Sequence, residues 1–407
     1  MLLAALGLFV TTVAGCERTS PASDGLPMAS VERRDSAGVE IVEVGALPED
    51  ALARGWSLAD EPALVLGGID AGDAYQFFQV SGARLLPDGR LVVVSRGAKD
   101  VRVYAPDGTP LAVHGGPGEG PGEFQAPQLL GMRGDSLVVF DTPLARVSLV
   151  HPDDGVVRTF QVHPEGVGYP IGQGLVAGRA VLIGGGASFS SSDGGMPSGL
   201  LRPPSTYVSV DFDGREAVRY GDFPTFEMWA EVRDGGFSAT SLPFGLVTVV
   251  AVGDLFCLST SEAYEVRCWD VEGRLVRVLR VDRPRRPVGG PAIDAYRHAL
   301  LEDAESEEAG RAALQRMRDM PLPDRMPALG ALAFDDLGNL WVMDYRPRGE
   351  AGPNRWTVFA PDGAPIGRVA TPDGFQPTQV GEDFVVGVGR DELGVERIEV
   401  RRLERGG

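Results

Sequence analysis

The chain contains few of the side chains that usually form zinc or redox centres. Among its 407 residues there are only three cysteines and four histidines. Positive charge is also scarce, because 57 Asp and Glu outnumber 38 Lys and Arg and leave a formal net charge of −19. Such an acidic surface repels nucleic acid and anionic lipid headgroups, so we expect no nucleic-acid partner.

A hydrophobic run long enough to span a membrane is missing at the N-terminus. The apolar run from Leu2 to Val13 is shorter than the roughly 20 residues that a spanning helix needs. It ends in Val-Ala-Gly-Cys and resembles a bacterial lipoprotein signal, in which cleavage before Cys16 leaves that thiol carrying lipid. The resemblance implies a signal peptide (1–15), a membrane anchor and a place in the cell envelope, periplasmic or at the cell surface. The alternative is an ordinary cleaved signal with a chance cysteine.

The polar, Pro- and Ser-rich residues that follow (16–37) are predicted to form a lipidated, flexible tether. The folded body is assigned to residues 38–407. The whole chain contains 55 glycines and 31 prolines, which indicate many turns and short strands.

A glycine turn followed by an apolar, β-branched run recurs six times. Three of the five intervals are 43 to 45 residues long, and the other two contain insertions. These turns are at Gly89, Gly134, Gly178, Gly253, Gly338 and Gly381. The regular interval predicts six repeated units of short strands.

A second turn, of Asp-Gly or Glu-Gly type, follows inside five of the units, at Gly108, Gly155, Gly214, Gly273 and Gly363. The sixth unit ends near residue 403 without one, and the strand-like residues 61–68 have no unit of their own. We therefore predict an all-β, six-bladed β-propeller of four-stranded antiparallel blades, closed by pairing of 61–68 with 396–403.

The stretch "GGPGEGPGEF" (115–124) lies between the first two units. Pro121-Gly122 suits a type II turn, and Phe124 is placed to pack between neighbouring blades. This bend, ending in Gly-x-Phe before an inner strand, resembles the inter-blade joint of NHL-repeat proteins. The resemblance, which covers about 61–403, is to NHL-repeat and TolB-like six-bladed propellers. A phosphate-binding loop is disfavoured, because no Lys-Ser/Thr follows and the next segment is a strand.

Every long connection is expected at the same end of the blades. These connections are 184–205, 222–245, 345–354 and a helical insertion between blades 4 and 5 (about 283–327). Elaboration of one end is typical of a recognition surface. Its candidate ligand-binding residues are Phe226, Trp229, His298, Tyr345 and Arg346. The first part of the arginine-rich run 274–286 is interpreted as charge that protects an outer strand edge; the alternative is a patch that binds a partner.

These features favour a non-catalytic, membrane-tethered scaffold that binds a protein, peptide or glycan, with no catalytic residue and no cofactor. The alternative is a metal-dependent hydrolase or lyase, lactonase-like or amidating-lyase-like, with calcium or zinc in the central funnel. His114, His163 and His298 are weak candidates for metal ligands, and no lactonase motif can be matched residue by residue.

Cys257 and Cys268 lie on consecutive strands of the fourth unit. A hairpin that is symmetric about Glu262-Ala263 places them directly opposite each other. We therefore predict a disulfide, which export from the cytoplasm would permit. The alternative is a pair of buried free thiols.

Overall fold

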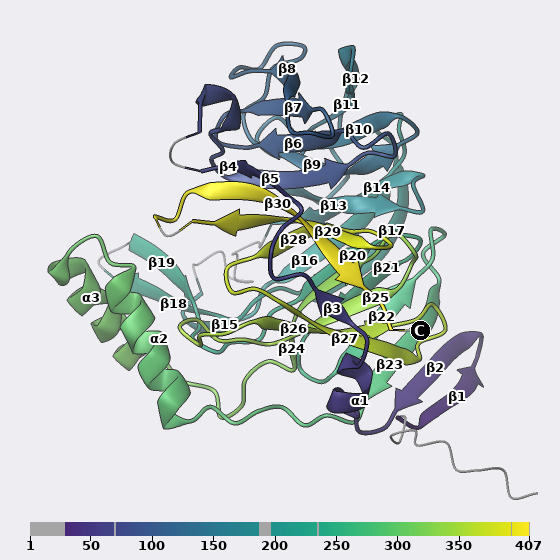
Figure 1. The fold of residues 1–407 in the computed structure, drawn as a ribbon. Helices are drawn as coiled ribbons and strands as arrows, with labels where there is room; N and C mark the ends of the chain where they lie inside the picture. Colours follow the sequence, from purple (N-terminus) through teal and green to yellow (C-terminus); the bar gives the residue numbers. More distant parts are fainter. Residues whose placement is uncertain (1–28, 69–70, 187–196, 234–235, 392, 407) are drawn as a thin grey trace, which may run out of the picture.

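Six antiparallel sheets form the blades of a β-propeller, as predicted (Figure 1). The computed structural model describes residues 29–68, 71–186, 197–233, 236–391 and 393–406. The first three blades consist of β5 (Val80–Leu85), β6 (Leu91–Ser95), β7 (Asp100–Tyr104) and β8 (Pro110–Gly115); β9 (Pro127–Arg133), β10 (Ser136–Asp141), β11 (Arg146–His151) and β12 (Gly155–Gln161); and β13 (Pro170–Val176), β14 (Ala180–Gly185), β16 (Pro204–Val210) and β17 (Glu216–Pro224).

The last three blades follow the same antiparallel order. They consist of β20 (Val249–Val252), β21 (Phe256–Ser259), β22 (Glu265–Trp269) and β23 (Leu275–Val281); β24 (Leu329–Phe334), β25 (Leu340–Asp344), β26 (Asn354–Phe359) and β27 (Pro365–Thr371); and β28 (Gln376–Val380), β29 (Phe384–Arg390), β30 (Glu396–Glu404) and β4 (Leu64–Gly67). The ring closes as predicted, because β4 pairs antiparallel with β30 from Leu64↔Val400 to Gly67↔Arg397. The two-residue strand β3 (Ser57–Leu58) pairs with the end of β30.

Blade 4 is larger than predicted. A hairpin of β1 (Val31–Ser36) and β2 (Val39–Val44) adds to it, with β2 parallel to β23. Residues 31–36, which the sequence assigned to the flexible tether, therefore form a strand. Their polar side chains are mostly exposed because β1 is the new outer edge, whereas Val42 and Val44 of β2 are buried in the core.

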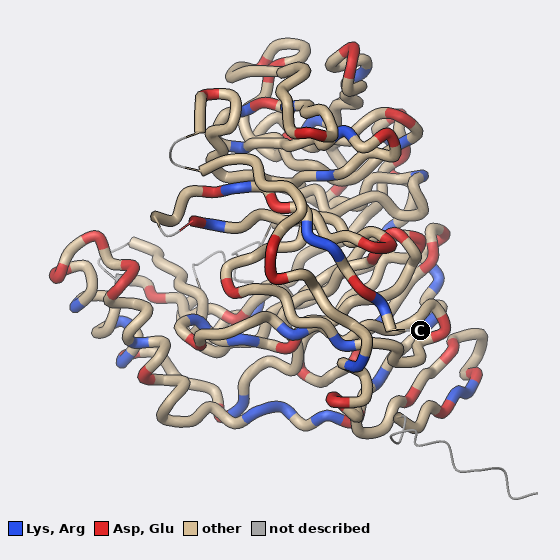
Figure 2. The backbone as a smooth tube through the Cα atoms, in the orientation of Figure 1, with Lys and Arg blue, Asp and Glu red and all other residues tan. Residues whose placement is uncertain are grey.

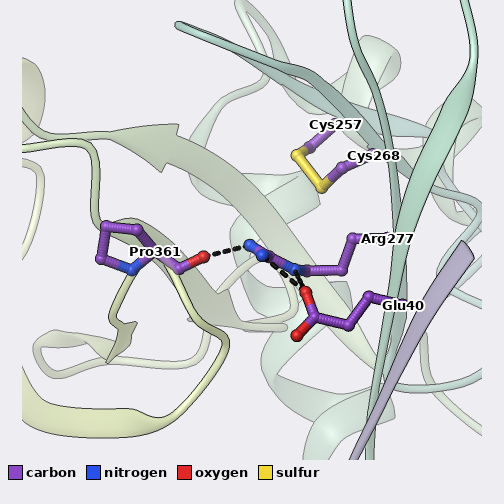
Figure 3. The surroundings of a disulfide bond; sticks show 5 residues. All are labelled: Glu40, Cys257, Cys268, Arg277 and Pro361. Atoms are coloured by element: carbon purple, nitrogen blue, oxygen red, sulfur yellow. Dashed lines mark hydrogen bonds and ion pairs between the residues drawn. A yellow bond between two sulfur atoms is a disulfide. The ribbon is translucent and has the colours of Figure 1, made fainter. Parts of the chain in front are cut away.

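The addition of β2 also changes the role of the arginine-rich run 274–286. Strand β23 pairs with β2 and is not an edge strand. Its arginines therefore lie beside β2 and do not protect an unpaired strand edge. Arg277 forms an ion pair with Glu40 of β2 at 2.7 Å and donates to the Pro361 carbonyl of blade 5 (Figure 3). Arg277 thus connects β2 to the turn between β26 and β27 of blade 5.

Apolar side chains between neighbouring blades make up the core. Between blades 1 and 2, Phe124 is fully buried against valines of both blades, which confirms its predicted position. The preceding turn also has the expected form, because Glu123 N–H donates to the Gly120 carbonyl at 3.1 Å and Gly122 has a φ of +81°.

The predicted disulfide is present. Cys257 and Cys268 are register partners on β21 and β22, and their sulfur atoms are bonded (Figure 3).

The predicted helical insertion between blades 4 and 5 contains α2 (Gly290–Glu302) and α3 (Glu307–Asp319). The short helix α1 (Glu49–Ala53) follows the N-terminal hairpin. A further sheet, not predicted, combines β15 (Gly199–Leu201), β18 (Met228–Arg233) and β19 (Gly236–Ser241). In the part of the chain that the structure describes, no helix has both the length and the apolar composition to cross a bilayer.

Candidate functional site

The long connections all leave the blades at the end where the fourth strand of one blade leads to the first strand of the next. Two of them contribute the sheet β15–β18–β19, and a third contributes α2 and α3. Figure 1 shows α2, α3, β18 and β19 together on one side of the propeller. We call this side the elaborated end; it is formed by the described residues of the connections 184–205, 222–245, 283–327 and 345–354.

The sheet β15–β18–β19 presents a row of side chains across its three strands. Leu200 is the register partner of Trp229, and Trp229 is the partner of Thr240. Strand alternation places Met228 and Ala230 on the opposite face, where they are buried. We call Leu200, Trp229 and Thr240 the Trp229 platform.

The Trp229 platform is apolar and accessible. Leu200 is 52% exposed, Thr240 is exposed and Trp229 is half-buried. The Trp229 indole N–H lies 3.3 Å from a Glu231 carboxylate oxygen, which fixes the ring on the sheet. Phe226, just before β18, is 40% exposed. Of the predicted ligand-binding residues, Trp229 and Phe226 therefore lie in the same segment at the elaborated end.

Tyr345 has a different environment. It packs with Phe244 and Tyr296 in the small core beneath the helical insertion. Burial raises the pKa of its phenol to about 12, so the group is neutral at physiological pH. Tyr345 supports the helices and does not extend the platform.

Arg346 lines a separate cleft of about 500 Å³ beside blade 5. Its guanidinium is 2.6 Å from Asp373 and also donates to the Gly352 carbonyl. We call this the arginine cleft, after the six arginines that line it: Arg283, Arg285, Arg286, Arg346, Arg355 and Arg368. The sequence singled out only Arg346 as a ligand-binding residue; the local run 283–286 was the available signal for three of the others.

The structure gives each of the three candidate metal-binding histidines its own surroundings. His114 Nε2 is 2.7 Å from the Pro152 carbonyl oxygen on blade 2. His163 is exposed after β12, and His298 is exposed on α2, with Nδ1 3.3 Å from Glu302. Among the described residues, no three or more His, Cys, Asp or Glu side chains are grouped to hold a metal ion.

A second cavity, of about 430 Å³, lies at the opposite end, beside the turns that join the first and second strands of the blades. Two of its charged lining side chains, Arg84 and Asp336, pair with each other. Arg84 of blade 1 is 2.9 Å from Asp336 of blade 5, and Gln379 of blade 6 donates to Asp336 while it accepts from Leu85 N–H. These contacts connect the neighbouring blades 5, 6 and 1, and the sequence did not predict them.

No protein family model matches the chain, and no curated protein matches its sequence. Among solved structures it is similar to a DUF4221 family member from Bacteroides vulgatus, at 10% identity and a TM-score of 0.49 over 86% of this chain and 99% of that one. It is also similar to regucalcin, a calcium-binding protein from Agrobacterium tumefaciens, at 11% identity and a TM-score of 0.39 over 82% of this chain and 94% of that one. A third similar structure is inactive virginiamycin B lyase from Staphylococcus aureus, at 10% identity and a TM-score of 0.37 over 84% of this chain and 98% of that one. Such values carry no argument about ligand or activity. The NHL-repeat and TolB-like assignment stays a prediction.

Proposed function

We propose that the chain acts in the cell envelope as a lipid-anchored, non-catalytic propeller that binds a protein, peptide or glycan at its elaborated end. The proposal depends mainly on the Trp229 platform. Leu200 and Trp229 lie next to each other, partly exposed, on a sheet that belongs to none of the six blades. A rigid Trp beside an exposed Leu provides a large apolar contact area at little entropic cost, which is a common basis of recognition.

A location outside the cytoplasm is supported by two features. The Cys257–Cys268 disulfide would persist in an oxidising compartment and be reduced in most cytoplasms. The apolar run before Cys16 supplies an export signal. Residues 1–28 lie outside the described part of the chain, so the anchor is argued from the sequence.

Site-specific photo-crosslinking in the native envelope would test the binding surface. A photoreactive amino acid at Leu200 is expected to form a specific adduct, and Trp229→Ala should reduce its yield about tenfold, since removal of a central aromatic anchor commonly costs over 1 kcal/mol. Leu337 is the matched control, because it is 50% exposed but lies in a turn at the opposite end.

Protease and glycosidase treatment of the adduct would distinguish a protein or peptide from a glycan. Equal labelling at Leu200 and Leu337, or an adduct that Trp229→Ala leaves unchanged, would contradict the proposal. If the Trp229→Ala protein melts at the same temperature as the wild type, the loss of the adduct comes from the platform and not from unfolding.

A further inference from the structure

The arginine cleft is a basic site on an acidic protein. It lies at the elaborated end between α1, the connection 345–353 and the segment that leads into α2. Figure 2 shows the arginines of that segment as a run of blue at the lower edge of the molecule. Six arginines line the cleft with only four carboxylates, Glu49, Asp50, Asp344 and Glu350, in a chain whose net charge is −19.

Two of the arginines form the neutralised floor of the cleft. Arg283 and Arg368 both contact Asp344 and Glu49, with Arg368 2.7 Å from Asp344 and 3.2 Å from Glu49. The Arg368 side chain is only 7% exposed. Since two cations meet two carboxylates, the floor carries little net charge and holds a fixed geometry.

Two further arginines have one carboxylate each. Arg286 is 3.2 Å from Glu350, and Arg346 pairs with Asp373, which is not a lining residue of the cleft. Their positions are therefore fixed, and their remaining N–H groups can still donate to a ligand.

The last two arginines have no carboxylate partner among the described residues. Arg285 donates to the carbonyls of Arg325 and Met326, both at 2.7 Å. The Arg355 side chain is exposed and makes no hydrogen bond or ion pair within the described chain. Of the four lining carboxylates, Asp50 alone forms no ion pair within the described chain. The cleft therefore has two arginines without an ion pair, Arg285 and Arg355, against one such carboxylate.

The surroundings of Arg285 disfavour its charge. Burial is the largest cause and lowers the pKa of its guanidinium. The nearby positive charges of Arg325 and Arg202 lower it further, and the carboxylates of Glu227 and Glu262 oppose them without reversing the shift. A bound anion would relieve this cost. Guanidinium groups bind carboxylate and phosphate through paired hydrogen bonds, and a recessed site strengthens the attraction.

We propose that the arginine cleft binds a small molecule with two or more oxyanionic groups, carboxylate or phosphate, and that Arg285 and Arg355 contact it. The volume of about 500 Å³ lies within the usual range for small-ligand pockets. The cleft shares no lining residue with the Trp229 platform, so the proposal is independent of the proposed function.

Titration calorimetry at low ionic strength would test this, with citrate and pyrophosphate as separate probes and uncharged glycerol as the neutral control. We expect saturable binding of at least one anion, weakened about tenfold or more by Arg355→Glu, because a lost hydrogen bond between charged groups typically costs about 1.5–3 kcal/mol. The preferred probe identifies the carboxylate or the phosphate class.

Arg179→Glu is the matched control. It makes the same change in net charge at an exposed arginine in the turn between β13 and β14, at the opposite end, and should leave binding within about twofold. Arg285→Gln should also weaken binding while thermal unfolding shows that the protein is folded. Equal loss in Arg355→Glu and Arg179→Glu would overturn the proposal, as would absence of saturation by either anion up to about 10 mM.

Discussion

Leu66 of β4 lies directly opposite Ile398 of β30, although the two residues come from opposite ends of the folded chain. Both are almost fully buried in one core cluster between blades 6 and 1. Blade 6 therefore takes its three inner strands from the C-terminal part and its outer strand from the N-terminal part. The contact closes the ring and makes the stability of blade 6 depend on residues 64–67.

The first prediction concerns this closure. Leu66→Asp should destabilise the protein by about 3 kcal/mol or more, because it buries an unpaired charge where β4 meets the core. The loss should expose the edge of β30 and promote association. Thermal unfolding and size-exclusion chromatography would measure both effects. Leu393→Asp, at a side chain that is 70% exposed, is the control. A Leu66→Asp variant that stays monomeric and melts like the wild type would show that closure does not depend on this pair.

The second prediction concerns the turn between β7 and β8. Gly108 has a φ of +86°, and a Cβ added there would lie 2.7 Å from a Leu66 methyl carbon. Gly108→Ala should therefore cost the left-handed strain of about 1 kcal/mol plus a steric penalty. Gly122 has a similar φ of +81° and open space around it, so Gly122→Ala reports the strain alone. Denaturant unfolding of the two variants measures the difference, and equal losses would argue against the contact with Leu66.

The blades could be predicted because each repeats a local signal, a glycine turn before an apolar run. Closure followed from counting strands, since residues 61–68 were surplus and the sixth unit was incomplete. The disulfide followed from hairpin symmetry about Glu262-Ala263. In these cases, the partner strands lie close in sequence or the repeat itself reveals the missing one.

Features built from distant segments could not be predicted in this way. Strand β2 pairs in parallel with β23, although the two strands are far apart in the sequence. No turn between them marks the pairing. Strand β15 is only three residues long, so neither it nor the position of Leu200 opposite Trp229 is visible in the sequence. The arginine cleft combines residues from five separate segments, and only the run 283–286 is a local signal.

The third prediction is a loss of stability in acid where β22 pairs with β23 in blade 4. Burial would raise the pKa of Glu265, but hydrogen bonds from Arg280 and Arg267 outweigh it and hold this pKa below its usual value of 4.5. A lowered pKa in the folded state means that the contribution is present above pH 4.5 and is lost as the pH falls below it. Urea unfolding from about pH 6 to about pH 3 should show a smaller decline in the free energy of unfolding for Glu265→Gln than for the wild type. A parallel decline in both proteins would assign the acid sensitivity to other groups.

The last prediction concerns Cys16, which lies outside the described residues. The first strand begins at Val31, so the 14 residues between Cys16 and Val31 separate the proposed anchor from the propeller. Such a segment spans at most about 50 Å when fully extended, enough to hold the folded body near a bilayer without inserting it. Cys16→Ser removes the thiol to which lipid would be attached, and the protein should move from the membrane pellet to the soluble fraction after fractionation. Cys257→Ser, which affects only the disulfide, should leave the distribution unchanged. A high-salt wash separates lipid anchoring from charge-dependent adsorption, because salt screens surface electrostatics but does not release an acyl chain. If the Cys16→Ser protein stays in the washed pellet, attachment depends on something other than this cysteine.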